Sequence, residues 1–296
     1  MSEAGEQTKI FILGAGRVGR AFTSCLQAKG NTPVGIWCRS EAGANRAEVS
    51  TGLAWQSGPY PENLDKADAV LLAVSDDAVA HVAQSLYENG LLTDKQAIFH
   101  CGGARPAREA MPGLPSEFCL GTLHPLVAVA DGQHAMRSLT GAYFAVEGDA
   151  RAVELGEAIV QAIGARSFRL NCDQMCLYHA AAVVASNHTV ALWHHATVIL
   201  QEAGIDKTMA TEVLKPLLTS ILDNVSNQGL PEALTGPVKR GDAQTLRRHM
   251  EELKRRLPEE LELYRAGTRA TIETAAACKD SPLAELLEKM KAATDS

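Results

Sequence analysis

The chain has 296 residues, of which 46% are hydrophobic and 21% charged, a composition typical of a soluble globular protein with room for two domains. Its net charge of -7, without any basic stripe, argues against binding to nucleic acid or to an anionic membrane. No stretch approaches the roughly 20 apolar residues of a membrane span. The seven cysteines are scattered and odd in number, which favours reduced thiols, no metal site and a cytoplasmic location.

Short apolar runs alternate with helical stretches up to about residue 170. This alternation predicts a parallel sheet covered by helices, a Rossmann-type α/β domain over residues 1–170. Such sheets bind their ligands at the carboxyl ends of the strands. The runs interpreted as strands are "KIFILGAG", "TPVGIWCRS", "DAVLLAVSDD", "KQAIFHCGG", "EFCLGTLHP", "GAYFAVEG" and "ARSFRL".

The strand pattern stops at Asn171, and an all-α second domain is predicted over residues 171–296. One long helix is expected to end at Gly204, a residue suited to a helix C-terminus, and Pro216 kinks or breaks the next helix. Alanine is abundant in these helices, so we expect packing through small side chains and a homodimer built on them.

A glycine turn follows the first predicted strand directly and opens a helix. In the G-x-G-x-x-G spacing the first glycine makes the turn, the second lets a pyrophosphate approach the backbone, and the third packs helix on strand. A tight turn without a ligand is the alternative. The predicted dinucleotide-binding residues of this turn are Gly14, Ala15, Gly16, Arg17, Val18 and Gly19.

The end of the second strand indicates which dinucleotide is bound. An NAD site usually has an Asp or Glu there, whereas this chain has Arg39 and Ser40, which suit the 2′-phosphate of NADP. A surface arginine is the alternative. Val74, Ser75 and Cys101 follow later strands and complete the predicted cofactor-binding set.

Histidines are the main candidates for chemistry in the first domain. His124 is expected just after a strand, near the nicotinamide, where it can donate to a substrate oxygen or act as a general acid; a structural role is the alternative. His100 fits a core or capping role better than catalysis. Nothing near Cys101 suggests an activated thiolate.

The segment "YHAAAVVASN" has the composition of a helix buried in a core, yet it carries a histidine and, eight positions later, an asparagine. His179, Val183 and Asn187 lie along one oblique stripe of a regular helix. We therefore predict that His179 and Asn187 face a cleft between the domains and orient a carbonyl, imine or carboxylate there. A hydrogen-bonded core pair is the alternative.

The segment "ALTGPVKRGDAQT" joins two predicted helices through an unusual turn. One interpretation is a loop that closes over the ligand, with Thr235 and Arg240 binding substrate. The other is a capping turn in which Asp242 is the N-cap of the next helix.

Several of these motifs together resemble a family of uncharacterised Rossmann-like proteins. Its N-terminal domain is similar to pyrroline-5-carboxylate reductase and deazaflavin-dependent NADP oxidoreductase, and its C-terminal helical domain has no known function. The resemblance runs from Lys9 to Tyr264 and implies an NADP-binding sheet domain with a dimerising helical domain. It rests on "FILGAGRVG", "HCGGA", "GTLHPL", "YHAAAVVASN" and "ALTGPVKRGD".

Two wider resemblances suggest roles for individual residues. Ketopantoate reductases carry a catalytic lysine and an asparagine where His179 and Asn187 stand, and prephenate dehydrogenases carry a histidine-proline pair resembling His124-Pro125. Members of the Rossmann-like family described above commonly have a serine where this chain has Gly102. The serine hydroxyl is therefore absent here.

Two functions follow from the sequence. The first is an NADP(H)-dependent oxidoreductase acting on a small carbonyl or imine bound between the domains, with His124 as proton donor or anchor and His179 and Asn187 orienting the substrate. The second is a non-catalytic NADP(H)-binding sensor or scaffold dimer, which Gly102 and the missing lysine at position 179 favour.

Overall fold

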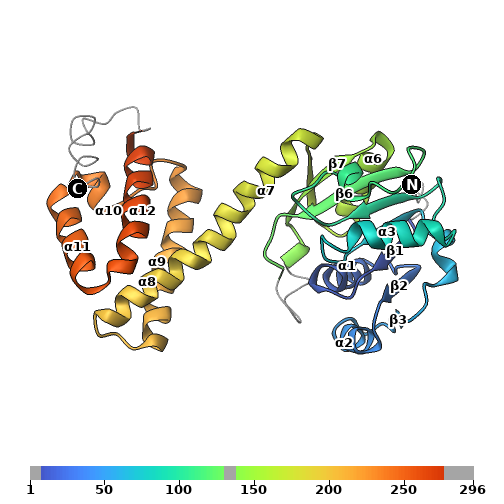
Figure 1. Ribbon diagram of the computed structural model, residues 1–296, viewed down its shortest axis with the longest axis horizontal. Coiled ribbons are helices and arrows are strands. Elements are labelled where there is room, and N and C mark those ends of the chain that lie inside the picture. The colour runs from blue at the N-terminus through green and yellow to red at the C-terminus, as the bar shows by residue number, and fades with distance from the viewer. Residues whose placement is uncertain (1–7, 130–137, 277–296) are drawn as a thin grey trace. The chain divides into compact units, whose positions relative to one another are not determined.

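A computed structural model describes residues 8–129 and 138–276 (Figure 1). The chain divides into two compact units, residues 1–186 and 187–296. The strands end at Arg169, whereas the units divide at Ser186. The roles predicted for the two parts, NADP binding over residues 1–170 and dimerisation over residues 171–296, remain predictions. Within the described helices, none has both the length and the hydropathy needed to cross a bilayer.

An eight-stranded sheet in the order β3-β2-β1-β4-β5-β6-β7-β8 forms the first unit. All neighbouring strands are parallel except β6 and β7, so the predicted Rossmann-type parallel sheet is confirmed as a mostly parallel sheet, with one antiparallel pair that the sequence did not indicate. The seven predicted strands are confirmed, and the two-residue β3 is additional. The strands are β1 (Ile10–Leu13), β2 (Gly35–Cys38), β3 (Gln56–Ser57), β4 (Ala69–Leu72), β5 (Ala97–His100), β6 (Cys119–Pro125), β7 (Tyr143–Gly148) and β8 (Arg166–Arg169).

Helices cover both faces of this sheet, because its central strands are apolar on both sides. One face packs Phe22, Phe99 and Phe144 with the helices α1, α2 and α6. The other packs Phe11 and Ile98 with α3 and α4. These helices are α1 (Arg17–Ala28), α2 (Glu41–Thr51), α3 (Val79–Glu88), α4 (Ala107–Ala110) and α6 (Ala150–Ala162), with the short 3₁₀ turn η1 (Glu62–Lys66) before β4.

Only helices follow β8 in the described chain, as the sequence predicts. Gly204 has a left-handed backbone (φ +95°) after the helix it ends, and α9 runs through Pro216 without a break. The elements are η2 (Cys172–Gln174), α7 (Met175–Val183), the π-helix η3 (Val184–His188), α8 (Thr189–Glu202), α9 (Lys207–Gln228), α10 (Gly236–Arg240), α11 (Ala243–Arg256) and α12 (Pro258–Ala276).

The long helix from α7 to α8 is not a core helix, contrary to what its composition suggests. Within α7 only Met175 is buried, and within α8 only Thr197. Leu177 is 78% exposed and Val190 is 70% exposed. Alanine and valine indicate that a helix face is apolar, but they do not indicate whether the same chain covers it.

Candidate functional site

The glycine turn after β1 has the geometry that its spacing predicts. Gly14 has a positive φ of +115°, and a Cβ there would lie 2.2 Å from the carbonyl oxygen of Ala73. A Cβ on Gly19 would lie 1.9 Å from the carbonyl oxygen of Gly14. At Gly16, the N-cap of α1, the nearest atom would be 3.7 Å away and no side chain caps the helix. The turn therefore presents an open helix N-terminus that fits an anion such as a pyrophosphate.

Two arginines lie near the end of β2. Arg39 is exposed directly after the strand, and Ser40 is the N-cap of α2, where its hydroxyl accepts a hydrogen bond from the Gly43 amide. Burial raises the pKa of the Cys38 thiol, and the nearby charge of Arg46 partly offsets the rise. Arg46 was not among the predicted residues, because only packing shows that this α2 residue lies near Cys38.

The loop after β4 lies against the glycine turn, since a Cβ on Gly14 would be 3.1 Å from the Val74 amide. The neighbouring Ser75 is exposed, and its hydrogen bond to the Asp77 carboxylate lowers the pKa of that carboxyl. The structure thus brings Val74 to the turn, as a cofactor-binding residue requires.

A polar row of His100, Thr122 and Glu147 crosses β5, β6 and β7 in register. His100 Nδ1 accepts a hydrogen bond from the Gly102 amide (3.1 Å), so Nε2 carries the proton and donates to the Thr122 hydroxyl (2.9 Å). Thr122 donates to Glu147 (3.0 Å), which also accepts from the Ala107 amide. Burial, aided by nearby positive charge, lowers the pKa of His100 to about 4. The core role predicted for His100 is confirmed.

The loop after β5 places Cys101 and Gly102 beside Asp76. Burial, together with the Asp76 charge, raises the pKa of Cys101 to about 12, so its thiol is not an activated nucleophile at neutral pH. A Cβ on Gly102 would lie 2.7 Å from the Asp76 Oδ1. A serine at position 102 would therefore require the exposed Asp76 side chain to move.

His124 lies within β6, not after it as predicted. The strand continues beyond its last pair with β5 at Thr122, because β7 pairs with it further along, placing His124 opposite Ala145. Its Nδ1 is 2.7 Å from the Tyr178 hydroxyl. Burial, with a smaller contribution from His179, lowers the pKa of His124 to about 4, so the imidazole is neutral at pH 7.

A ring cluster forms where α7 approaches β6, and it consists of His124, Tyr178 and His179. The His124 ring makes edge contacts with Tyr178 (5.5 Å between centroids) and His179 (5.7 Å). Gly103 is buried beside them, and a Cβ there would lie 2.7 Å from both His124 Nε2 and His179 Cδ2. The structure thus brings His124 and His179 together. Tyr178 was missed, although it directly precedes His179.

Asn187 does not continue the predicted stripe from His179. It lies in the π-helix Val184–His188, whose wider turn breaks the spacing of four residues on which the stripe depends. Asn187 is exposed, so the alternative of a hydrogen-bonded core pair also fails. Asn187 opens the second unit, and its role in orienting substrate remains a prediction.

The segment around Thr235 and Arg240 is a short helix, not a loop. Both residues are exposed at the ends of α10, which Gly241 terminates with a left-handed backbone. Asp242 is the N-cap of α11 and accepts hydrogen bonds from the amide and hydroxyl of Thr245. The capping role of Asp242 is confirmed, and substrate binding by Thr235 and Arg240 remains a prediction.

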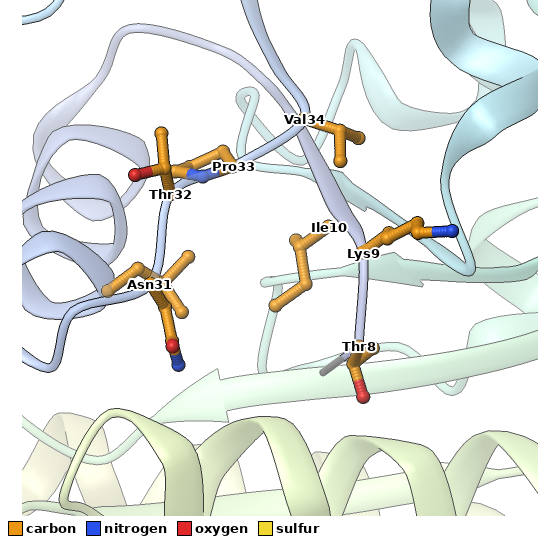
Figure 2. Close-up of a pocket in the computed structure, with 8 residues that line it drawn as sticks. Thr8, Lys9, Ile10, Asn31, Thr32, Pro33 and Val34 are labelled. Carbon is orange, nitrogen blue, oxygen red and sulfur yellow. The ribbon is translucent and has the colours of Figure 1, made fainter. Parts of the chain in front are cut away.

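A pocket of about 310 Å³ opens at the other end of the sheet (Figure 2). It lies where β1 begins, so it is separate from the glycine turn and the ring cluster at the carboxyl ends of the strands. The pocket is lined by Thr8, Lys9, Ile10, Leu26, Asn31, Thr32, Pro33 and Val34.

In the described parts of the chain, no three His, Cys, Asp or Glu side chains gather as a metal site requires.

Solved structures share this fold over nearly the whole chain. Protein TM1727 from Thermotoga maritima has 24% sequence identity and a TM-score of 0.67, covering 90% of this chain and 98% of that one. A pyrroline-5-carboxylate reductase from Coxiella burnetii has 15% identity and a TM-score of 0.60, covering 97% and 99%. A reductive aminase from Aspergillus terreus, in complex with NADPH and ethyl levulinate, has 19% identity and a TM-score of 0.61, covering 96% and 99%.

Family models match both parts of the sequence, whereas no curated protein gives a significant match. Residues 9–98 match the model described as NADP oxidoreductase coenzyme F420-dependent. Residues 142–271 match the model described as Domain of unknown function (DUF2520). The chain therefore combines an N-terminal domain like those of the NADP oxidoreductases with a C-terminal domain of the DUF2520 type, as the sequence motifs imply.

Proposed function

We propose that the protein is an NADP(H)-dependent oxidoreductase that reduces a small carbonyl or imine. The observation that carries the proposal is the ring cluster at the carboxyl end of β6. Because β1, β4, β5 and β6 are parallel, His124 and the glycine turn share one edge of the sheet, where such folds bind ligands. A neutral imidazole thus lies at the edge where a dinucleotide would sit.

Gly14, Gly16 and Gly19 would hold the pyrophosphate, because the packed first and third glycines leave the α1 N-terminus open at the second. The guanidinium of Arg39 suits a 2′-phosphate, and Arg46 adds positive charge near Cys38, the residue before Arg39. When bound, the nicotinamide supplies or accepts a hydride.

His124 would act on the atom that becomes negative during reduction. As a neutral imidazole it donates a hydrogen bond to the carbonyl oxygen or imine nitrogen and stabilises the charge that develops there. Hydride addition at the carbon, with a proton taken from water by the oxygen or nitrogen, would give an alcohol or an amine. His124 keeps its own proton, because a neutral imidazole is too weak an acid to release it, so it acts as a hydrogen-bond donor and not as a general acid. His179, beside His124 at Gly103, would orient the substrate. No covalent step at Cys101 is needed.

The activity is tested by titrating the purified protein with NADPH and NADH, and then by following nicotinamide absorbance with a panel of carbonyls and imines. We expect NADPH consumption on at least one substrate class. His124→Gln should reduce kcat by about 100-fold or more, with little change in the Kd for NADPH. An equal loss of NADPH affinity would contradict the role given to His124.

The cofactor preference is tested separately with Arg39→Asp. The variant should weaken NADPH binding far more than NADH binding, because only NADPH carries the 2′-phosphate. Equal losses for the two nucleotides would contradict the assignment. Arg46→Ala should give a smaller loss in the same direction.

A second candidate is an NADP(H)-binding sensor or scaffold without turnover. Gly102 favours it, because the hydroxyl that relatives commonly carry at this position is absent and the nearest side chain to the glycine is the carboxylate of Asp76. Tight NADPH binding by the wild-type protein, with no consumption across the whole panel, would establish the sensor and refute the reductase.

A homodimer is part of the proposed function in either case. Many apolar side chains of the late helices are exposed in the single chain, and a second copy would bury them. Sedimentation equilibrium should therefore give twice the chain mass, and a monomer at micromolar concentration would contradict this. The exposed residues include Leu177, Val184, Val190, Leu192, Val213, Leu217, Ile221 and Leu222.

A further inference from the structure

We infer that Tyr178 is a positioning residue that fixes the tautomer of His124, so that Nε2 carries the proton and donates on the side of Gly103. The inference rests on the proposed function only for its catalytic consequence. The tautomer itself follows from the contacts within the first unit.

The direction of the hydrogen bond between Tyr178 and His124 decides the tautomer. The two atoms, the hydroxyl and Nδ1, are 2.7 Å apart. A neutral imidazole has one N–H, so either the phenol donates to Nδ1 or Nδ1–H donates to the phenol oxygen. A phenol is a much stronger acid than a neutral imidazole N–H, and an imidazole nitrogen is the stronger base. The better donor therefore meets the better acceptor only when Tyr178 donates.

The surroundings favour the same direction. Among the described residues, the Tyr178 hydroxyl has no acceptor other than His124 Nδ1. If Nδ1 carried the proton, the phenol proton would lose this acceptor in a half-buried site, which is unfavourable when water cannot replace it. Burial raises the pKa of Tyr178 to about 12 and lowers that of His124 to about 4, so both partners are neutral across the neutral pH range.

Packing holds the phenol in place. The Tyr178 ring makes an edge contact with Phe168 of β8 (5.7 Å between centroids) and another with His124 (5.5 Å). These contacts depend on the ring and not on the hydroxyl. Loss of the hydroxyl would therefore leave the ring cluster packed while removing the group that selects the tautomer.

The polar row supplies an internal precedent. His100 is also neutral, and the Gly102 amide donates to its Nδ1, which forces the proton onto Nε2. In His100 the Nε2–H is used by Thr122 in the core. In His124 the equivalent nitrogen turns toward Gly103, at the edge of the sheet where a substrate would bind.

The experiment is nitrogen-15 NMR of the histidine rings in the full-length protein, with the His124 signals assigned by their loss in His124→Gln. Long-range proton–nitrogen couplings distinguish the two tautomers. We expect the Nε2–H form in the wild type and a mixture, or the Nδ1–H form, in Tyr178→Phe. The Nδ1–H form in the wild type, or an unchanged pattern in Tyr178→Phe, would overturn the inference.

Tyr143→Phe is the matched control. Tyr143 belongs to the same group of aromatic rings through Phe168, but its hydroxyl accepts from Arg166 and not from a histidine. Its removal should leave the His124 tautomer unchanged. A thermal unfolding midpoint close to that of the wild type in both variants would show that the ring packing is retained.

Activity gives a second readout. Tyr178→Phe should lower kcat by at least about tenfold with an unchanged Kd for NADPH, whereas Tyr143→Phe should change neither. If the tautomer shifts as expected but no substrate is consumed by the wild type, the proposed function fails and the inference stands. If the tautomer does not shift, the inference fails whatever the activity.

Discussion

Replacing Thr122 with valine tests the polar row across β5, β6 and β7. Valine has nearly the shape of threonine, so the change removes the hydroxyl that joins His100 to Glu147 without creating a cavity. The His100 Nε2–H would lose its acceptor in a fully buried position, at a cost of about 1–3 kcal/mol. Its tautomer cannot change to escape this, because the Gly102 amide occupies Nδ1.

The same change removes a hydrogen bond to the buried Glu147 carboxylate, worth about 1.5–3 kcal/mol. Because both losses come from one hydroxyl, they overlap, and we expect a total of about 3 kcal/mol in the free energy of unfolding. Thr122→Ser is the control, since it keeps the hydroxyl and removes one buried methyl group, at a cost of about 1 kcal/mol.

Urea unfolding followed by tryptophan fluorescence measures the difference. Trp37 and Trp55 are buried in the first unit, so a Trp193→Phe background restricts the signal to that unit. Thr122→Val should be about 2 kcal/mol less stable than Thr122→Ser, with an unchanged slope against urea. Equal stability of the two variants would refute the reasoning, because it would mean that the hydroxyl contributes nothing to the fold.

Three further predictions concern pH, packing and loop anchoring. His100 and His124 have pKa values lowered from 6.5 to about 4, so the stability that each neutral imidazole contributes is complete above pH 6.5 and is lost as the pH falls toward 4. Urea unfolding should therefore show a loss of about 3 kcal/mol per histidine over this pH range. His100→Asn should make the free energy of unfolding depend less steeply on pH. Gly103→Ala should lower the unfolding free energy by about 1–3 kcal/mol and reduce kcat, because its Cβ would displace the rings of His124 and His179. Arg108→Lys should cost about 1 kcal/mol in the same assay, since an ammonium cannot replace a guanidinium that binds three carbonyls and a carboxylate.

The strands could be predicted because central parallel strands, buried on both faces, form continuous apolar runs. The reversal of β7 could not, since residues alternate between the two faces of a strand in the same way whichever direction it runs. The strand β3 was missed because Gln56 and Ser57 are too few to form a pattern. Pairing with β7 also explains why His124 lies inside β6 and not after it.

The candidate site was predictable where it depends on local sequence. Gly14 and Gly19 are required by the turn itself, so their spacing was sufficient to predict it. Tyr178 was not predictable in the same way, because the face of α7 that meets β6 is fixed by packing between distant segments. The stripe from His179 to Asn187 failed for a related reason, since nothing in "VASNH" indicates a π-helix.

His100 and His124 show why a lowered pKa does not by itself identify a reactive histidine. Burial brings both pKa values to about 4, and both Nδ1 atoms lie within hydrogen-bond distance of a protein donor. The difference lies at Nε2. In His100 this nitrogen is within a closed row of hydrogen bonds that ends at the Ala107 amide, so a proton there has only a structural use. In His124 it turns toward Gly103, where the lack of a side chain brings His179 close, and this nitrogen is therefore the one that the proposed function assigns to substrate.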